Sequence, residues 1–439
     1  MVLALLVAPL QTMADQEPPE DVLIDPTCDA AGFSLLGGCP GWTAFHDRDG
    51  TTSYPRSVAA NSVASFLAGY DYEYFCCIRP YLDAFDIDDG SLLWSADVRG
   101  SLAVTGHIWP TAVAADETRV FVAGSVEDQE GGWHDPAFLA AFDADSGSLL
   151  WSQLYEGSGG EVDVGAIEVD GDLVFMAGDE ELPEYDSCHE SVAFVAAFST
   201  SSGANEWSTT HEQCNRGFRA EGVTVVGNDV FMTGQDCPYY CPAWDANVRA
   251  FIASFDRNTG QSGWTYLSSY YGNYDLHDVG VDIASDSSQL YLVIERIERA
   301  PPDYDRVSTA RIIAFTAISG VTVWERTVEG VDDRLSPHGI VADAGFVYVT
   351  GRDVGRKAYT STESWAMALV STDGSLAWDR IFAGSGPFFF VEGIDLAPTK
   401  LVLAGRSCRP DACTATEGTV TTLDRGLAYE ALGPPPSLP

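Results

Sequence analysis

The sequence predicts an all-β protein, a single β-propeller of seven four-stranded blades. Three observations lead to this prediction. A pattern Ala-x-Asp-x-x-(Ser/Thr)-Gly-x-x-x-Trp returns at intervals of roughly 53 to 60 residues, short apolar runs precede its copies, and no stretch shows sustained helical periodicity. The copies are Ala84–Trp94, Ala141–Trp151, Ala197–Trp207, Ser254–Trp264, Ala314–Trp324 and Ala368–Trp378, with a weak seventh from Thr421 to Tyr429.

Each repeat supplies four strands, called a to d from the centre outward. The apolar runs are rich in Val, Phe, Ala and Tyr and are bounded by Gly, Asp and Ser, which is typical of strands joined by turns. In the third repeat we expect strands near Gly165–Val169, Leu173–Ala177, Ala193–Ser199 and Ala204–Ser208. The Asp-x-x-Ser-Gly stretch predicts the c–d turn, with glycine at positive φ. The closing aromatic residues are expected to dock between neighbouring blades; they are Trp94, Trp151, Trp207, Trp264, Trp324 and Trp378.

The N-terminal end leaves the number of blades open. Ala44–Gly50 followed by Tyr54 keeps the motif spacing with Tyr in place of Trp. This fragment is either the outer hairpin of an eighth, degraded blade, with Phe33–Gly37 as its b strand, or it helps to close the ring against the last blade. We favour seven blades. One propeller domain is expected at 41–431, between an acidic, cysteine-containing segment at 15–40 and a proline-rich tail at 432–439.

Composition and the N-terminus point to export. The first ten residues are apolar, and an acidic stretch follows Ala14, so we expect a signal peptide at 1–14; a wrongly assigned start or a frayed terminus is the alternative. No segment is long enough to span a bilayer. Asp and Glu number 65 against 23 Lys and Arg, for a net charge of −42. This excess argues against nucleic acids and anionic membranes as partners, and it suits a protein kept soluble in salt. The scarcity of lysine equally fits a GC-rich genome.

Ten cysteines gather in the connections between predicted strands, as expected of disulfides in an oxidising compartment. In a propeller the b–c and d–a connections share one face, which allows Cys188 to meet Cys214. Cys237 and Cys241 flank one loop, as do Cys408 and Cys413. The remaining four are Cys28, Cys39, Cys76 and Cys77. Adjacent Cα atoms are closer than disulfides favour, so we prefer two bridges from Cys76 and Cys77 to the N-terminal segment over a vicinal bond.

The repeat resembles the tryptophan-docking repeat of the quinoprotein (PQQ) dehydrogenase-like propellers over about residues 41–431. This family contains quinone enzymes and non-catalytic scaffold propellers, and fold does not confer function. The resemblance implies, for an enzyme, a vicinal disulfide against the quinone and a carboxylate set around calcium. Cys76-Cys77 falls between strands b and c instead of before an inner strand, and we cannot map the calcium set. We therefore expect no cofactor, with PQQ and calcium as the alternative.

Two groups of residues are candidates for binding. The long connections on the b–c and d–a face are aromatic, which favours either a binding face or a cover for the blade ends; these residues are Tyr72, Tyr74, Trp133, Tyr239, Tyr240, Trp244, Tyr271 and Tyr274. Aligning the repeats on the glycine that opens strand a places Val164, Glu221, Val279, His338 and Glu392 at one position around the channel mouth. The candidates there are Asp163, Glu221, His277, Asp278, His338 and Glu392, as a cation site or as polar lining for a wet channel.

The sequence therefore predicts a secreted or cell-surface propeller without catalytic activity. It is expected to bind a protein or glycan partner through the face that carries the b–c and d–a connections. A quinone- and calcium-dependent dehydrogenase and a purely structural component of a surface assembly are the alternatives. The c–d turns are faintly similar to calcium loops, but hairpin chemistry explains them better.

Overall fold

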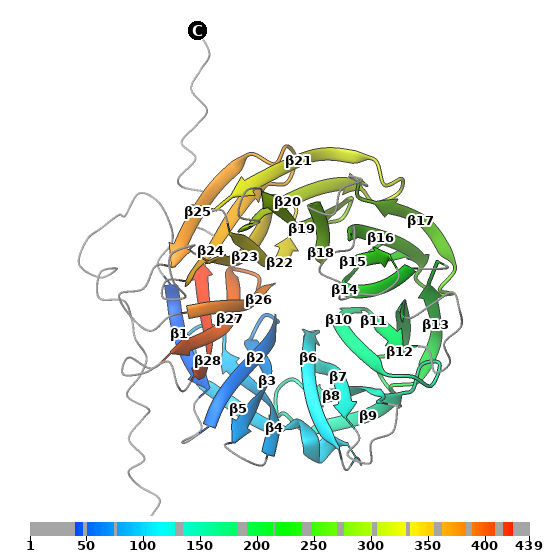
Figure 1. The fold of residues 1–439 in the computed structure, drawn as a ribbon. Helices are drawn as coiled ribbons and strands as arrows, with labels where there is room; N and C mark the ends of the chain where they lie inside the picture. Colours follow the sequence, from blue (N-terminus) through cyan, green and yellow to red (C-terminus); the bar gives the residue numbers. More distant parts are fainter. Residues whose placement is uncertain are drawn as a thin grey trace, which may run out of the picture.

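The computed structural model describes residues 40–46, 51–73, 77–102, 104, 106–127, 135–181, 191–213, 216–238, 248–269, 276–300, 305–330, 334–354, 362–382, 389–408 and 416–424. These residues form seven antiparallel sheets of four strands each, arranged as a ring (Figure 1). The one helix in the described residues is the 3₁₀ turn η1 (Val98–Ser101). The predicted seven-bladed all-β propeller is confirmed.

In six blades the strands follow one another from the axis outward. Blade 1 consists of β2 (Thr51–Ala60), β3 (Ala64–Glu73), β4 (Cys77–Asp86) and β5 (Leu92–Asp97). Blade 2 consists of β6 (His107–Ala115), β7 (Arg119–Glu127), β8 (Ala137–Asp143) and β9 (Leu149–Tyr155). Blade 3 consists of β10 (Val162–Asp170), β11 (Leu173–Glu181), β12 (Ser191–Ser199) and β13 (Asn205–His211). Blade 4 consists of β14 (Arg216–Val226), β15 (Asp229–Pro238), β16 (Arg249–Asp256) and β17 (Ser262–Leu267). Blade 5 consists of β18 (Leu276–Ser285), β19 (Gln289–Ala300), β20 (Asp305–Thr316) and β21 (Thr322–Glu329). Blade 6 consists of β22 (Leu335–Ala342), β23 (Phe346–Val354), β24 (Thr362–Val370) and β25 (Leu376–Phe382).

The seventh blade joins the two ends of the chain. Its inner strands are β26 (Phe389–Leu396), β27 (Lys400–Cys408) and β28 (Thr416–Asp424), and its outer strand is β1 (Pro40–His46), which pairs with β28 (Figure 1). The alternative of an eighth blade is therefore wrong: Ala44 lies in this outer strand, whereas Tyr54 lies in the innermost strand of blade 1. The fragment closes the ring, and Phe33–Gly37 lies outside the described residues.

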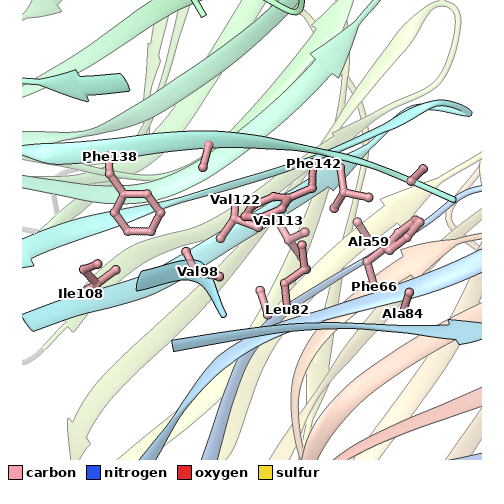
Figure 2. Close-up of a cluster of buried hydrophobic side chains, with 14 of the residues drawn as sticks. Ala59, Phe66, Leu82, Ala84, Val98, Ile108, Val113, Val122, Phe138 and Phe142 are labelled. Carbon is pink, nitrogen blue, oxygen red and sulfur yellow. The ribbon is translucent and has the colours of Figure 1, made fainter. Parts of the chain in front are cut away.

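Apolar side chains fill the spaces between neighbouring blades. In β8 nearly every residue is buried, whereas the outer strand β9 alternates between exposed and half-buried residues. Figure 2 shows the layer between blades 1 and 2, where Phe66 and Leu82 of blade 1 face Phe138 and Phe142 of blade 2. Burying one such aromatic ring contributes about 2–3 kcal/mol, so these layers hold the ring together.

The repeat motif links each blade to the next in two ways. The indole Nε1 of Trp207 donates to the Arg257 carbonyl at 2.9 Å, and its ring lies against Gly260, which has a φ of 68°. A Cβ on that glycine would come within 2.6 Å of the ring. Hydrogen bonds to the matching carbonyl of the next blade come also from Trp94, Trp151, Trp264 and Trp324. Trp378 packs against the core between blades 6 and 7.

Candidate functional site at the channel mouth

Every inner strand carries a β-bulge at the same level of the ring. The extra residues are Arg56, Thr111, Gly165, Glu221, Val281, His338 and Glu392. A bulge redirects side chains, and all seven residues line a cavity of about 400 Å³ on the ring axis, built from the inner strands alone. The bulges lie near the middle of the inner strands, at the end of the cavity nearer to the b–c and d–a connections, whose face we call the loop face. The opposite face carries the short a–b and c–d turns.

The bulges correct the alignment made on glycine. Glu221, His338 and Glu392 do occupy one equivalent position, but their partners in blades 3 and 5 are Gly165 and Val281 instead of Val164 and Val279. The glycine is not at a constant place: it is the bulge residue itself in blade 3 and precedes the bulge in blade 5. The alignment on glycine is therefore wrong by one residue in blade 3 and by two residues in blade 5.

Three of the six channel-mouth candidates do not line the cavity. Asp278 is completely buried within blade 5, where its carboxylate accepts from Arg296 and Arg311, each at 2.9 Å. His277 is also buried, at 6% exposure, and does not line the cavity. Asp163 does not line it either; its carboxylate accepts from Ser125 of blade 2 at 3.0 Å.

Positive charge collects on one side of the mouth. Glu392 accepts from Arg406 at 2.7 Å and, through its other oxygen, from Arg352 at 3.2 Å. The Arg406 guanidinium also lies over the ring of Tyr54, 5.5 Å from its centroid. Arg56, which is exposed, donates to the hydroxyl of Tyr70 at 3.2 Å.

We call Arg56, Arg352 and Arg406 the arginine arc; they belong to blades 1, 6 and 7. Glu392 is its internal carboxylate, and Glu295 of blade 5 acts electrostatically on Arg352. Three guanidinium groups thus face two carboxylates, an excess of positive charge in a chain whose net charge is −42. Sequence reasoning missed Arg352 and Arg406 because both lie on second strands, and only the ring places them over the mouth.

His338 is held neutral inside this arc. Its Nε2 accepts from Arg352 Nε at 2.8 Å. Burial, followed by the nearby charges of Arg352 and Arg406, lowers the pKa of His338 to about 3. The imidazole lone pair is engaged by a permanent cation, so His338 orients Arg352 instead of taking up a proton.

Carboxylates collect on the opposite side, in blades 3 and 4. We call Asp163, Asp179 and Glu221 the acidic arc. Burial raises the pKa of Asp179 to about 8 despite Arg219, whose guanidinium lies 3.5 Å away, and the charges of Asp163 and Glu221 add to the effect. Burial likewise raises the pKa of Glu221, which accepts from Gln235 at 3.2 Å. Carboxyl groups therefore gather around Arg219 on this side of the mouth, opposite the arginine arc.

Three further carboxylates line the cavity. Asp282 accepts from the amide of Ile340 in the next blade at 3.0 Å, and Asp395 accepts from the amide of Ala60 at 2.7 Å. Burial raises the pKa of Glu168 to about 8, that of Asp282 to about 7 and that of Asp395 to about 6. Asp282 and Asp395 are thus hydrogen-bonded between blades, a structural use of the carboxylates.

Most of the aromatic loop-face candidates lie outside the described residues: Tyr74, Trp133, Tyr239, Tyr240, Trp244, Tyr271 and Tyr274. Tyr72, near the loop-face end of β3, is described and is 45% exposed. Of the cysteines, Cys77 begins β4, Cys237 lies near the end of β15 and Cys408 ends β27, all at the loop face. Cys237 is buried and disulfide-bonded.

The cysteine pairings remain predictions. Cys28, Cys39, Cys76, Cys188, Cys214, Cys241 and Cys413 all lie outside the described residues. Cys77 is on the third strand of its blade, away from the axis.

The described residues form no recognisable calcium site. Calcium takes six to eight oxygen ligands, yet the described part of the chain contains no group of three or more His, Cys, Asp or Glu arranged to hold a metal ion. Cys77 lies on the third strand of blade 1, away from the cavity. We derive no catalytic step through these groups.

Comparisons with known proteins agree with the fold. A family model described as outer membrane protein assembly factor BamB matches residues 80–380. No curated protein matches the chain. Solved structures that resemble it include the quinohemoprotein alcohol dehydrogenase from Comamonas testosteroni, with a TM-score of 0.47 and 10% identity over 89% of this chain and 76% of that one.

The β-propeller domain of the Trilobed protease from Pyrococcus furiosus gives a TM-score of 0.48 and 10% identity over 85% of this chain and 96% of that one. No helix within the described ranges is long and apolar enough to cross a membrane.

Proposed function

The chain belongs to the family described as outer membrane protein assembly factor BamB, and from this membership and the charged channel mouth we propose that it is an exported, non-catalytic binding module. Its partner is a protein that seats on the loop face over the mouth. The single observation that carries the proposal is the arginine arc on blades 6, 7 and 1, a local excess of positive charge in a chain whose net charge is −42.

The arginine arc supports recognition of carboxylates. Arg352 and Arg406 are 22% and 26% exposed, so both guanidinium groups reach solvent at the mouth while Glu392 holds them in place. Partly buried arginines bind carboxylates with good geometry and little loss of side-chain freedom. In a chain this acidic, long-range forces repel an acidic partner everywhere else. Binding of an acidic segment would therefore be specific to the arc.

The same groups support binding instead of proton transfer. Both oxygens of Glu392 accept from arginines, and Nε2 of His338 accepts from Arg352. A general base needs a free lone pair within reach of the substrate. Here Glu392 and His338 are both engaged by permanently charged donors, which supports a binding role for these two residues.

The test is a titration of the protein with oligoglutamate at low salt, monitored by isothermal titration calorimetry. We expect saturable binding that weakens at least tenfold in the double variant Arg352→Gln/Arg406→Gln. The matched control is Arg119→Gln/Arg257→Gln, which removes the same charge at the turn face. Glu392→Gln adds net positive charge to the arc and should tighten binding. Equal affinities in all four proteins, or no saturable binding, would refute the proposal.

The runner-up, a quinone-dependent dehydrogenase, is tested in parallel. The oxidised protein is incubated with pyrroloquinoline quinone and calcium, and dye reduction is followed with alcohols and sugars as substrates. Turnover would establish the enzyme, whereas quinone binding without turnover would identify the quinone as another carboxylate ligand of the arginine arc.

Export is a separate part of the proposal. It is supported by the apolar N-terminus and by the cysteines at the loop face, one of which is in a disulfide. N-terminal sequencing of the protein from its native cell should begin near Asp15, and alkylation under denaturing conditions should label few of the ten cysteines. An intact Met1 with ten free thiols would contradict export.

A further inference from the structure

The seam between blades 7 and 1 contains a buried charged cluster at the outer strand. His46 of β1 is 5% exposed and lies between two carboxylates of blade 1. Its Nε2 is 3.1 Å from Asp71 of β3, and its Nδ1 forms a short hydrogen bond with Asp83 of β4. The imidazole stacks on Tyr81, with ring centroids 3.7 Å apart and planes at 11°.

This cluster is peculiar to the seam. In blades 2, 3 and 4 the residue equivalent to Asp83 is Ala140, Ala196 or Ala253, each packed in an apolar core. In blade 1, the pair of Asp83 and His46 takes the place of the apolar contacts that these alanines make. Because His46 belongs to the outer strand of blade 7 while both aspartates belong to blade 1, the cluster links these two neighbouring blades at the seam.

We propose that β1 is a pH-sensitive strap: the protonated imidazole of His46, clamped between Asp71 and Asp83, holds the strand against β28 and blade 1, and loss of the proton releases it. Two ionised carboxylates around a neutral imidazole would leave buried negative charges without a counter-ion, which is strongly unfavourable. Release would leave β28 as an open edge strand, the kind of edge that accepts a strand from another chain.

The groups around His46 support this behaviour. Asp71 and Asp83 face it from β3 and β4, the Tyr81 ring covers one side, and Gly418 of β28 lies against its Cβ. The Tyr81 hydroxyl is itself hydrogen-bonded to Ser53 at 3.0 Å. Arg79, opposite Asp71 on β4, is exposed.

The direction of the pH dependence follows from His46. Burial opposes its charge, but hydrogen bonds and charge from the two aspartates outweigh it and raise the pKa to about 9 from 6.5. A raised histidine pKa stabilises the folded state below pH 6.5, and this contribution is lost as the pH rises from 6.5 through about 9. The strap is therefore closed at neutral pH and opens under alkaline conditions.

Hydrogen exchange on the whole oxidised protein tests the strap. Protection of the β1 and β28 amides, corrected for the pH dependence of intrinsic exchange, should fall by roughly two orders of magnitude between pH 6 and 9. The amides of β15 and β16 in blade 4 are the internal control. Their buried Asp236 is paired with Arg216 and Arg249, which stay charged throughout.

His46→Gln should exchange rapidly in β1 at pH 6 and show little further change up to pH 9. If this variant does not fold, Asp71→Asn is used in its place. The pH dependence of amide protection in the wild-type protein still tests the proposal. Equal loss of protection in β1 and in blade 4, or stable protection of β1 at pH 9, would overturn the proposal. A wild-type fall that His46→Gln reproduces in full would also overturn it, because another group would then be titrating.

Discussion

The seam between blades 7 and 1 and the interface between blades 3 and 4 solve the same problem with different side chains. At the 3–4 interface, Trp207 donates to the Arg257 carbonyl in the c–d turn of the next blade. At the seam, the equivalent carbonyl belongs to Ile87, and it accepts from the Nζ of Lys400 at 2.7 Å. The position opposite Thr421 in the outer strand, where the other blades have tryptophan, is Thr43. The acceptor is retained while the donor changes, as expected if the turn carbonyl needs a partner at both junctions.

Near the axis the seam resembles the junction between blades 5 and 6. Asp282 reaches from blade 5 to the Ile340 amide of blade 6, and Asp395 reaches from blade 7 to the Ala60 amide of blade 1. The seam and the 3–4 interface differ in the outer half of the blades. Closure of the ring relies there on ionic groups, namely Lys400 and the His46 cluster, where the other junctions rely on indole rings.

The largest expected effect breaks a tryptophan junction. Trp207→Ala should lower the free energy of unfolding by about 3–5 kcal/mol, since it removes a large ring from the layer between blades 3 and 4. Trp207→Phe keeps an aromatic ring but leaves the Arg257 carbonyl without its indole partner, and it should cost about 1–2 kcal/mol. Urea unfolding measures both. Equal losses would show that the hydrogen bond, and not the packed ring, holds the junction.

The inner carboxylates give a pH-dependent comparison of the two junctions. Burial raises the pKa of Asp282 to about 7 and that of Asp395 to about 6, so each loses stabilising power as the pH rises from 3.8 through that value. Asp282→Asn should therefore gain stability over the wild type by roughly 2–4 kcal/mol between pH 4 and 8. Asp395→Asn should gain less free energy of unfolding than Asp282→Asn, and this gain should reach its plateau at lower pH. Urea midpoints across this range test the order, and parallel curves for variant and wild type would contradict it.

A smaller effect isolates the seam. Lys400→Met preserves the length of a side chain that is 9% exposed but leaves the carbonyls of Ile87 and Asp88 without their ammonium donor. We expect a loss of about 1–3 kcal/mol, together with faster hydrogen exchange in β27 and β28 and unchanged exchange in blade 4. Arg119→Met at the turn face is the control for removal of one positive charge. If exchange rose equally in every blade, Lys400 would have no special role in closure.

The repeating part of the molecule was predictable because its causes are local. A turn needs its Asp and Gly within a few residues, and the docking Trp follows at a constant spacing, so one period shows both. The first three predicted strands of the third repeat lie within β10, β11 and β12, and the fourth overlaps β13 except at Ala204. The prediction failed at Asp278 because the glycine used for the alignment precedes the bulge in this strand, whereas it follows the bulge in blades 4, 6 and 7; Asp278 lies in a buried ion pair instead.

The sequence by itself therefore determined the architecture, the blade strands and the residues that join consecutive blades. Only the tertiary structure decided how the ring closes and which charges meet at its mouth. Closure pairs β1 with a strand from the far end of the chain, and the arginine arc brings together Arg56, Arg352 and Arg406 from three blades. Periodicity records contacts within and between adjacent repeats, whereas these contacts depend on bulge phase and on the circular arrangement of the blades, which no local spacing encodes.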